Sequence, residues 1–421
     1  MFKKTTFKNG LRIITVPMKN TKAVTLLVMV GTGSKYETKE LNGISHFLEH
    51  MFFKGTKKRP TTLKIAETLD KIGGACNAFT SKEFTGYWAK VDWKHLDLAL
   101  DWVSDIFLNS KLEKKEIKRE KGVIVEEINM YLDTPISYIG DLWEKLLYGN
   151  QPAGWLIIGE KKNILKFKRE HFLNYLRNHY SALNTVVCIA GNFNQKEVKK
   201  KVQKYFRDIK KKPAKEKLKV IEKQKHPQSL IHYKKTDQTH LCLGVRGYNL
   251  SQPEKYAQEI LTVILGANMS SRLFISIRER KGLCYTIRTS SDYSTDTGYL
   301  VTQAGIPHKN IGEVIKLVLK EYKNVKTRKV SDQELKKAKD YLKGISTLSL
   351  ESSDAQASFY SLQELLSRKI LTPREKFAKL DKVTLDDVQK AAKNIFRPEK
   401  LNLALIGPHK DKSKFQKLLK L

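Results

Sequence analysis

The spacing of apolar residues along the chain predicts an alternation of short strands and amphipathic helices. Two β-type runs flank Asn9-Gly10, a dipeptide typical of tight hairpins, and the apolar run over residues 23–30 predicts a central strand. Helical spacing begins near Asn42 and ends at Gly55. Further helices are predicted over residues 62–72, 93–107, 113–131, 136–148, 168–180 and 195–206, and further strands over 84–91 and 185–190.

A lysine-rich stretch separates this pattern from a second one. Residues 209–228 contain two prolines and no Phe, Trp or Tyr, which is typical of a linker. Strands follow over 241–247, 285–291, 299–304 and 401–406, with a helix over 254–265, further helices, and a basic helix at the end. The final strand and helix repeat those of residues 185–206 at an offset of roughly 215 residues. We therefore predict an α+β fold of two homologous halves, each a mostly antiparallel β-sheet covered by helices. The predicted boundaries are a first domain over 1–212, a linker over 213–228 and a second domain over 229–421.

Length and composition support a folded protein of two or three domains. Of the 421 residues, 40% are hydrophobic and 9% aromatic, enough to build a core in each domain. The four cysteines form no C-x-x-C pair and are expected to be free thiols in a reducing compartment. No run approaches about 18 apolar residues, and no apolar segment follows the basic N-terminus. We expect no membrane span and a cytoplasmic location.

The net charge of +35 is the one extreme feature of the composition. Such a balance raises nucleic-acid binding as an alternative function. The lysines, however, are spread along the whole chain and no nucleic-acid-binding motif accompanies them. Solvated lysine-rich faces are the favoured interpretation, and we expect no nucleic-acid partner.

The pentad His46-Phe47-Leu48-Glu49-His50 carries the sharpest chemical signal. On a helix, His46 and His50 project from one face and can bind one Zn²⁺. Glu49 lies on the same side and is placed to act as a general base that activates a water molecule. This order is the inverted form of a metalloprotease motif. The alternative is a pair of surface histidines with a carboxylate neighbour.

A catalytic zinc site needs a third protein ligand, and the helix predicted over residues 113–131 offers one. Glu120 and Glu127 are seven residues apart, so both carboxylates share a helix face. Glu127 is the candidate ligand, and Glu120 is the candidate partner for the other ring nitrogen of a ligand histidine. Glu126 is the local competitor of Glu127, which the seven-residue spacing favours. The alternative is that these carboxylates are solvated.

These motifs together resemble the pitrilysin/insulysin family of inverted-motif zinc peptidases. The resemblance is greatest to its short-subunit branch, which includes mitochondrial processing peptidase and bacterial relatives. It covers nearly the whole chain; the segments that carry it are NGISHFLEHMFFKGT, GGACNAFTSKEFTGYW, EKGVIVEEINMYLDTP and SSRLFISIRERKGLCYTI. One departure is Gln151-Pro152, where relatives often have His-Pro.

The resemblance implies roles for two further groups of residues. Asn77, Ala78 and Phe79 match an edge strand to which the substrate backbone adds. Arg278 and Tyr285 match a pair that binds the substrate carbonyl and stabilises the oxyanion. Without the resemblance, Arg278 would be interpreted as an exposed charge and Tyr285 as a half-buried strand aromatic.

The resemblance further implies a zinc-dependent metalloendopeptidase that holds one Zn²⁺ per chain and hydrolyses peptides or unfolded segments. Longer relatives place the zinc domain and the Arg/Tyr domain at opposite ends of four domains, whereas this chain has two. We therefore expect a homodimer whose sites are each completed by Arg278 and Tyr285 of the partner subunit. The alternative within the family is a catalytically silent partner or scaffold subunit.

Overall fold

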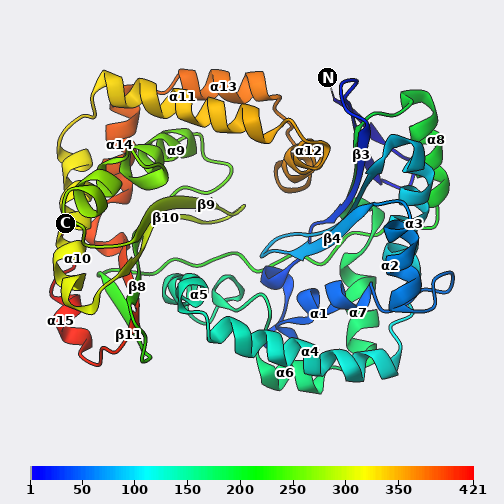
Figure 1. Ribbon diagram of the computed structural model, residues 1–421, viewed down its shortest axis with the longest axis horizontal. Helices are drawn as coiled ribbons and strands as arrows, with labels where there is room; N and C mark the ends of the chain where they lie inside the picture. Colours follow the sequence, from blue (N-terminus) through cyan, green and yellow to red (C-terminus); the bar gives the residue numbers. More distant parts are fainter. Residues whose placement is uncertain (1) are drawn as a thin grey trace. The chain divides into compact units, whose positions relative to one another are not determined.

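The computed structural model describes residues 2–421, which form two compact units (Figure 1). The first unit comprises the chain up to Asn129, residues 155–218 and residues 348–371. The second comprises residues 130–154, 219–347 and 372–421. Each unit therefore takes a segment from the other half of the sequence, and its bounds differ from the domains predicted over 1–212 and 229–421.

A six-stranded sheet forms the centre of the first unit. Its order is β1 (Lys3–Thr6), β2 (Arg12–Pro17), β6 (Thr185–Gly191), β3 (Ala23–Val30), β5 (Thr85–Asp92) and β4 (Ala75–Thr80). Only β2 and β6 run parallel. β1 and β2 form the predicted hairpin, with Lys3 opposite Thr15. Gly10 adopts a φ of +86° in its turn, a conformation that glycine accommodates without strain.

The second unit repeats this topology with one strand fewer. Its order is β7 (Gln228–Tyr233), β11 (Leu401–Gly407), β8 (Thr239–Arg246), β10 (Gly298–Ile306) and β9 (Thr286–Tyr293), and only β7 and β11 run parallel. The order matches β2-β6-β3-β5-β4 of the first sheet strand by strand. The prediction of two homologous α+β halves with mostly antiparallel sheets is confirmed. β7 was not predicted; it begins at Gln228, the last residue of the predicted linker, and continues to Tyr233.

Helices cover both faces of each sheet. Those of the first unit are α1 (Ile44–Met51), α2 (Thr62–Asp70), α3 (Leu96–Asn109), α4 (Lys114–Leu132), α6 (Lys161–Lys166), α7 (Arg169–His179), α8 (Gln195–Tyr205) and α12 (Ser353–Ser367). Those of the second are α5 (Pro135–Tyr148), α9 (Lys255–Thr262), α10 (Ile311–Thr327), α11 (Asp332–Ser349), α13 (Pro373–Asp381), α14 (Leu385–Ile395) and α15 (Lys412–Gln416). None of these helices is both long and apolar enough to cross a membrane.

Two helices pack on the sheet formed mainly by the other half of the sequence. α12 follows the second sheet's first four strands in the chain, yet it covers β3 and β6 (Figure 1). Alternate residues of those strands, including Leu27, Met29 and Cys188, form a core with Ala357 and Tyr360 of α12. Reciprocally, α5 covers β8 and β11 of the second sheet. This exchange explains why the compact units differ from the predicted domains.

A buried ion pair fixes α12 on the first sheet. The Arg12 guanidinium of β2 lies 3.3 Å from the Glu364 carboxylate of α12, and both side chains are buried. Lys4 of β1 approaches the other carboxylate oxygen at 2.7 Å. Arg12 also donates to the carbonyl oxygen of Leu183 at 3.0 Å. Because each buried charge has a partner, this contact favours one position of α12 on the sheet.

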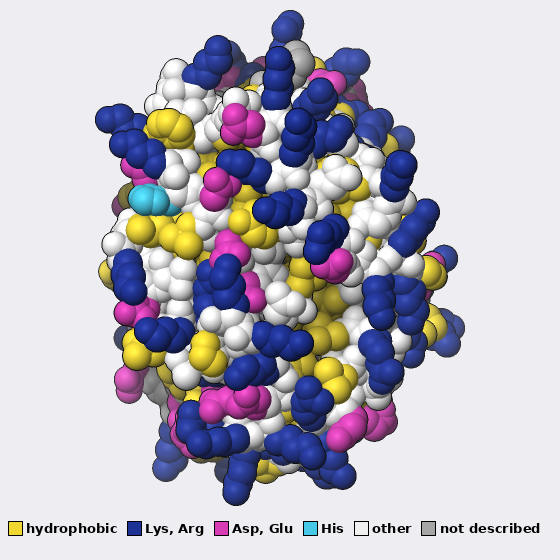
Figure 2. Space-filling view, turned by 90° about the vertical axis from the view of Figure 1, so that its right-hand side faces the viewer, with side chains coloured by type: hydrophobic (Ala, Val, Ile, Leu, Met, Phe, Trp, Pro, Cys, Tyr) yellow, Lys and Arg dark blue, Asp and Glu magenta, His cyan; other side chains and the backbone are white. Residues whose placement is uncertain are grey.

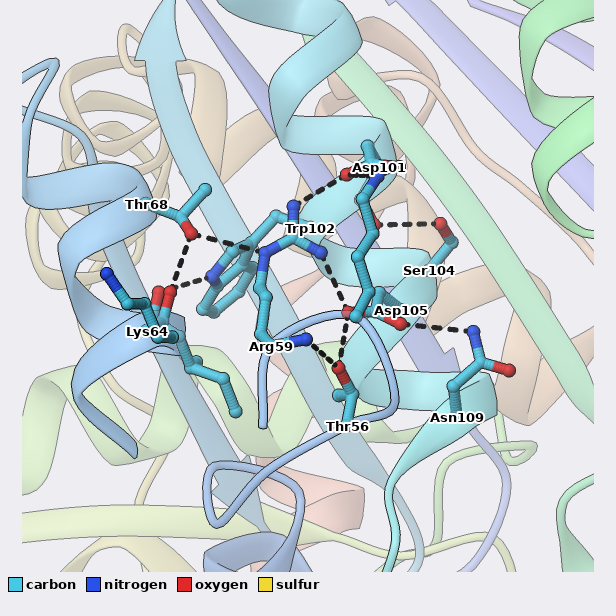
Figure 3. A network of polar contacts seen from close by, with 11 residues as sticks. Thr56, Arg59, Lys64, Thr68, Asp101, Trp102, Ser104, Asp105 and Asn109 are labelled. Carbon is cyan, nitrogen blue, oxygen red and sulfur yellow. Dashed lines mark hydrogen bonds and ion pairs between the residues drawn. The ribbon is translucent and has the colours of Figure 1, made fainter. Parts of the chain in front are cut away.

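A second buried network holds the segment that follows α1 (Figure 3). The guanidinium of Arg59 lies between two carboxylates of α3, at 2.6 Å from Asp101 and 2.7 Å from Asp105. The Thr56 hydroxyl donates to Asp105 at 2.7 Å and accepts from the Arg59 backbone N–H at 2.8 Å. The C-terminal end of α1 is thereby connected to a long helix of the core.

The positive charge is spread over the face of the molecule that Figure 2 shows. Figure 2 shows Lys and Arg over the whole of one face, with Asp and Glu between them and hydrophobic side chains exposed among them. On this face the cations do not form a separate patch. The distribution agrees with the interpretation of the net charge of +35 as solvated lysine-rich faces.

The ion pair of Arg12 makes a prediction for stability. Replacing Glu364 with Ala leaves the buried guanidinium without its carboxylate, so we expect the free energy of unfolding to fall by about 3 kcal/mol. Glu399 is the control, because its ion pair with Arg397 is solvent-exposed and Glu399→Ala should change stability by less than about 0.5 kcal/mol. Urea unfolding of both variants measures the difference. Equal effects of the two substitutions would contradict the assigned role of the pair.

Candidate metal centre

The short helix α1 presents His46, Glu49 and His50 on its open face. Its opposite face is packed in the core of the first unit; the buried apolar residues are Ile44, Phe47, Leu48 and Met51. The rings of His46 and His50 are 4.7 Å apart between centroids, and their side chains are 13% and 22% exposed. Helical spacing therefore brings the two imidazoles side by side at the surface of the helix, as predicted.

The carboxylate of Glu127 on α4 completes the cluster. Its Oε1 lies 3.6 Å from Nε2 of His46, and its Oε2 lies 3.5 Å from Nε2 of His50. One ligand atom from each of the three residues lies within 4.8 Å of the others. The neighbouring Glu126 is exposed and accepts from Asn129 instead. Of the two competing carboxylates, the structure brings Glu127 to the histidines.

The donor set of this cluster fits a divalent metal such as Zn²⁺. Two imidazole nitrogens and one carboxylate are the ligands of many catalytic zinc sites, with one position left for water or substrate. Oε2 of Glu127 is buried and accepts no hydrogen bond from the described residues, so a lone pair is free for a metal. Burial, with a smaller contribution from His50, lowers the pKa of His46 to about 3. His46 is therefore neutral near pH 7, the form that binds metals.

Glu120 orients the His50 ring through its Nδ1 atom. The carboxylate is 2% exposed and lies 2.9 Å from Nδ1 of His50, which places the ring proton on Nδ1 and leaves the Nε2 lone pair toward Glu127. Lys54 donates to the other oxygen at 2.7 Å. Burial opposes ionisation of Glu120, but the hydrogen bonds from His50 and Lys54 prevail and lower its pKa. Lys54 was not singled out from the sequence, although its place one turn after His50 was a usable signal.

Glu49 lies beside the cluster without belonging to it. Its Oε2 accepts a hydrogen bond from the Thr80 hydroxyl at 2.5 Å. Burial is the largest cause of a raised pKa of Glu49, which suits a group that exchanges protons. Thr80 ends β4, so a strand distant in sequence orients this carboxylate. Thr80 was not predicted from the sequence, where its only signal was its place directly after Asn77-Ala78-Phe79.

β4 is an edge strand, as the match of Asn77, Ala78 and Phe79 implied. It pairs with β5 on one side and is last in the strand order of its sheet. Ala78 is buried, Asn77 is exposed, and the Phe79 ring lies over Gly86, where a Cβ atom would come within 2.2 Å of it. The strand also packs against α1. An extended peptide can add to such an edge through backbone hydrogen bonds.

Arg278 and Tyr285 lie together in the second unit. The Arg278 guanidinium stacks over the rings of Phe274, at 4.7 Å, and Tyr285, at 5.3 Å. Tyr285 is 73% exposed and precedes β9, so its interpretation as a half-buried strand aromatic is wrong. The structure brings the two residues to each other, and their part in substrate binding stays a prediction.

The sequence matches the models of one peptidase family in both halves. The protein-family model described as "Insulinase (Peptidase family M16)" matches residues 12–159. The family model described as "Peptidase M16 inactive domain" matches residues 166–342. A Bacillus subtilis protein, "Uncharacterized zinc protease YmxG", is 38% identical over 97% of this chain and 98% of its own length.

Solved structures share the fold. A Helicobacter pylori protease aligns with a TM-score of 0.91 at 23% identity, over 97% of this chain and 100% of its own. A Pseudomonas fluorescens structure described as a "peptidase M16 inactive domain" aligns with a TM-score of 0.89 at 17% identity, over 98% and 99%.

The geometry of the cluster makes a prediction for metal binding. Glu127→Gln removes the anionic ligand, so zinc affinity should fall by more than the about 10- to 100-fold typical of losing an outer hydrogen bond. Glu126→Gln is the matched control on the same helix and should bind zinc like the wild type. Competition with a chromophoric chelator measures both. A loss of the same size in the two variants would show that Glu127 has no special place in the site.

Proposed function

Because this chain belongs to the insulinase family, peptidase family M16, we propose that it is a zinc-dependent metalloendopeptidase acting on peptides or unfolded protein segments. The observation that carries the proposal is the convergence of His46, His50 and Glu127 within 4.8 Å. Related proteins named as zinc proteases support the general activity.

His46, His50 and Glu127 hold one Zn²⁺ per chain. When bound, Zn²⁺ supplies Lewis acidity that polarises the scissile carbonyl and promotes ionisation of a water molecule. Glu120 keeps His50 in the tautomer whose Nε2 faces the site, through the hydrogen bond of 2.9 Å at Nδ1. Lys54 compensates the charge of Glu120, so that this buried carboxylate stays ionised.

Glu49 is the general base and then the general acid. It takes a proton from the attacking water as the new carbon–oxygen bond forms at the scissile carbonyl. It delivers that proton to the leaving amine nitrogen as the carbon–nitrogen bond breaks, so the carboxylate is regenerated in each cycle. The hydrogen bond from Thr80 to one oxygen of Glu49 orients the other oxygen for this transfer.

The edge strand β4 binds the substrate backbone. Backbone groups of residues 77–79 pair with an extended peptide, which selects for chain that is unfolded rather than for particular side chains. The Thr80 contact with Glu49 follows directly on this segment. The same short strand, β4, therefore binds the substrate backbone through residues 77–79 and orients the general base through Thr80.

Arg278 and Tyr285 complete the site from a second copy of the chain. The arginine binds a substrate carbonyl, and the exposed tyrosine hydroxyl donates to the oxyanion. The chain holds one pair of homologous α+β units, so a homodimer supplies both the zinc-binding and the Arg/Tyr parts twice.

A catalytically silent subunit is the second candidate function. It is favoured by the similarity to a structure described as an inactive M16 domain and by the matching model of residues 166–342. The presence of three candidate metal ligands and of Glu49 favours the active enzyme instead.

The role of Glu49 makes a prediction for activity. Glu49→Gln keeps the size of the side chain but removes its basicity, so we expect peptide hydrolysis to fall by about 10²- to 10⁴-fold. Zinc affinity should remain close to that of the wild type. Quenched fluorescent peptides measure the rate, with the exposed Glu126→Gln as control. Near-normal hydrolysis by Glu49→Gln would refute the mechanism, and inactivity of the zinc-loaded wild type would favour the silent subunit.

The shared site makes a prediction for mixtures of variants. Dimers of Glu49→Gln chains alone, or of Tyr285→Phe chains alone, should be inactive. A dimer with one chain of each kind holds one intact site, made from Glu49 of one chain and Tyr285 of the other. Equal mixing makes half of the dimers mixed, so activity should recover to about a quarter of the wild-type level. Subunit exchange is followed by native mass spectrometry. Exchange without recovery would contradict a site shared between copies.

A further inference from the structure

The helix that carries His46 and His50 begins at a residue that has no side chain to cap it. Gly43 is the N-cap of α1 and has a φ of +100°. A Cβ atom at this position would lie 2.8 Å from the carbonyl oxygen of Ile158 and 2.9 Å from Cα of Gly159. The Ser, Thr, Asp or Asn residues that cap most helices are therefore disfavoured here by both conformation and space.

A carboxylate from outside the helix takes the place of the missing cap. Oε2 of Glu37 accepts a hydrogen bond from the backbone N–H of Gly43, and Oε1 accepts one from that of Ser45, both at 2.8 Å. The side-chain amide of Asn42 donates to Oε2 at 3.0 Å. Burial raises the pKa of Glu37 to about 7, whereas the hydrogen bonds from these three donors lower it. A carboxylate that accepts backbone N–H bonds is favoured at a helix N-terminus.

The cap belongs to a buried chain of hydroxyl groups. Glu37 is 5% exposed, and the Ser45 hydroxyl also hydrogen-bonds to it. The Ser45 hydroxyl lies 2.7 Å from that of Tyr175 on α7, which lies 2.7 Å from that of Thr32 after β3. Breaking one link leaves buried polar groups unpaired, so the network holds the start of α1 in a single position.

His46 depends on this cap more than His50 does. His50 is held through its ring by Glu120, whereas Nδ1 of His46 has no hydrogen-bond partner among residues 2–421. His46 directly follows Ser45, and both belong to the first turn of α1. The position of the His46 ring is therefore set mainly by the backbone that Glu37 holds.

We infer that Glu37 is a positioning residue of the metal centre, which fixes the first turn of α1 and thereby places His46 for metal binding. The consequence for catalysis rests on the proposed function. The consequence for metal affinity does not, because it concerns only the cluster of His46, His50 and Glu127.

Zinc affinity and the spectrum of the cobalt-substituted protein test this inference. Glu37→Gln keeps the shape of the side chain but places an amide group opposite backbone donors. We expect zinc affinity to fall by about 10- to 100-fold. The visible absorption bands of bound Co²⁺ should shift, because the geometry at His46 changes. Both are measured at a temperature at which circular dichroism shows the variant to be folded.

Glu364→Gln is the matched control, because Glu364 is also a buried carboxylate of the first unit. It should lower stability while leaving zinc affinity and the cobalt spectrum like those of the wild type. Wild-type affinity and spectrum in folded Glu37→Gln would overturn the inference, as would equal losses in the two variants. If the wild type binds zinc but cleaves no peptide, the proposed function fails, and the zinc comparison still decides the role of Glu37.

Ser45→Ala keeps the test decisive if Glu37→Gln does not fold. It removes the hydroxyl between Glu37 and Tyr175 but retains the backbone N–H bonds to Glu37. We expect a smaller but measurable loss of zinc affinity, of a few-fold. An unchanged affinity and cobalt spectrum in Ser45→Ala would count against the buried network as the support of His46.

Discussion

The crossing of α1 and α4 is the constraint on which the candidate metal centre depends, and a partly buried hydrogen bond between His50 and Glu120 holds it. Glu120 and Glu127 are two turns apart on α4, so the contact that fixes the first carboxylate also brings the second to the histidines. An arrangement in which polar side chains turn their lone pairs toward one another is energetically unfavourable unless a metal ion binds between them. The surrounding fold must therefore impose this arrangement, and α1 is the element on which most of that support acts.

Both ends of α1 are fastened by satisfied polar networks. Glu37 binds the first N–H groups, and the segment after the helix is held by Arg59 between Asp101 and Asp105. Buried charges lower stability unless each finds a partner, and here each of these does. The first unit thus places two buried polar networks at the ends of α1, where a small shift of the helix would separate the ligands. In the second unit, by contrast, the candidate site residue Tyr285 is exposed.

The second sheet repeats five of the six strands of the first, and the exchange of α5 and α12 connects the two halves of the sequence. The second sheet reproduces the strand order of the first, and each sheet has two apolar faces that helices must cover. An amphipathic pattern states that a helix has an apolar face, but not which sheet it covers. The predicted domain boundaries followed chain order. In the structure, α5 packs on the second sheet and α12 packs on the first.

The sequence by itself determined the period of most elements, the two homologous α+β halves and the pairing of His46 with His50, because these depend on local spacing and on helix geometry. The choice of Glu127 over Glu126 also followed from spacing along one helix. Only the tertiary structure decided that Thr80 contacts Glu49, that Glu37 caps α1 and that Glu364 pairs with Arg12. Those contacts join residues whose separation in the chain carries no periodic signal, since they arise when distant elements pack and their buried polar groups must find partners.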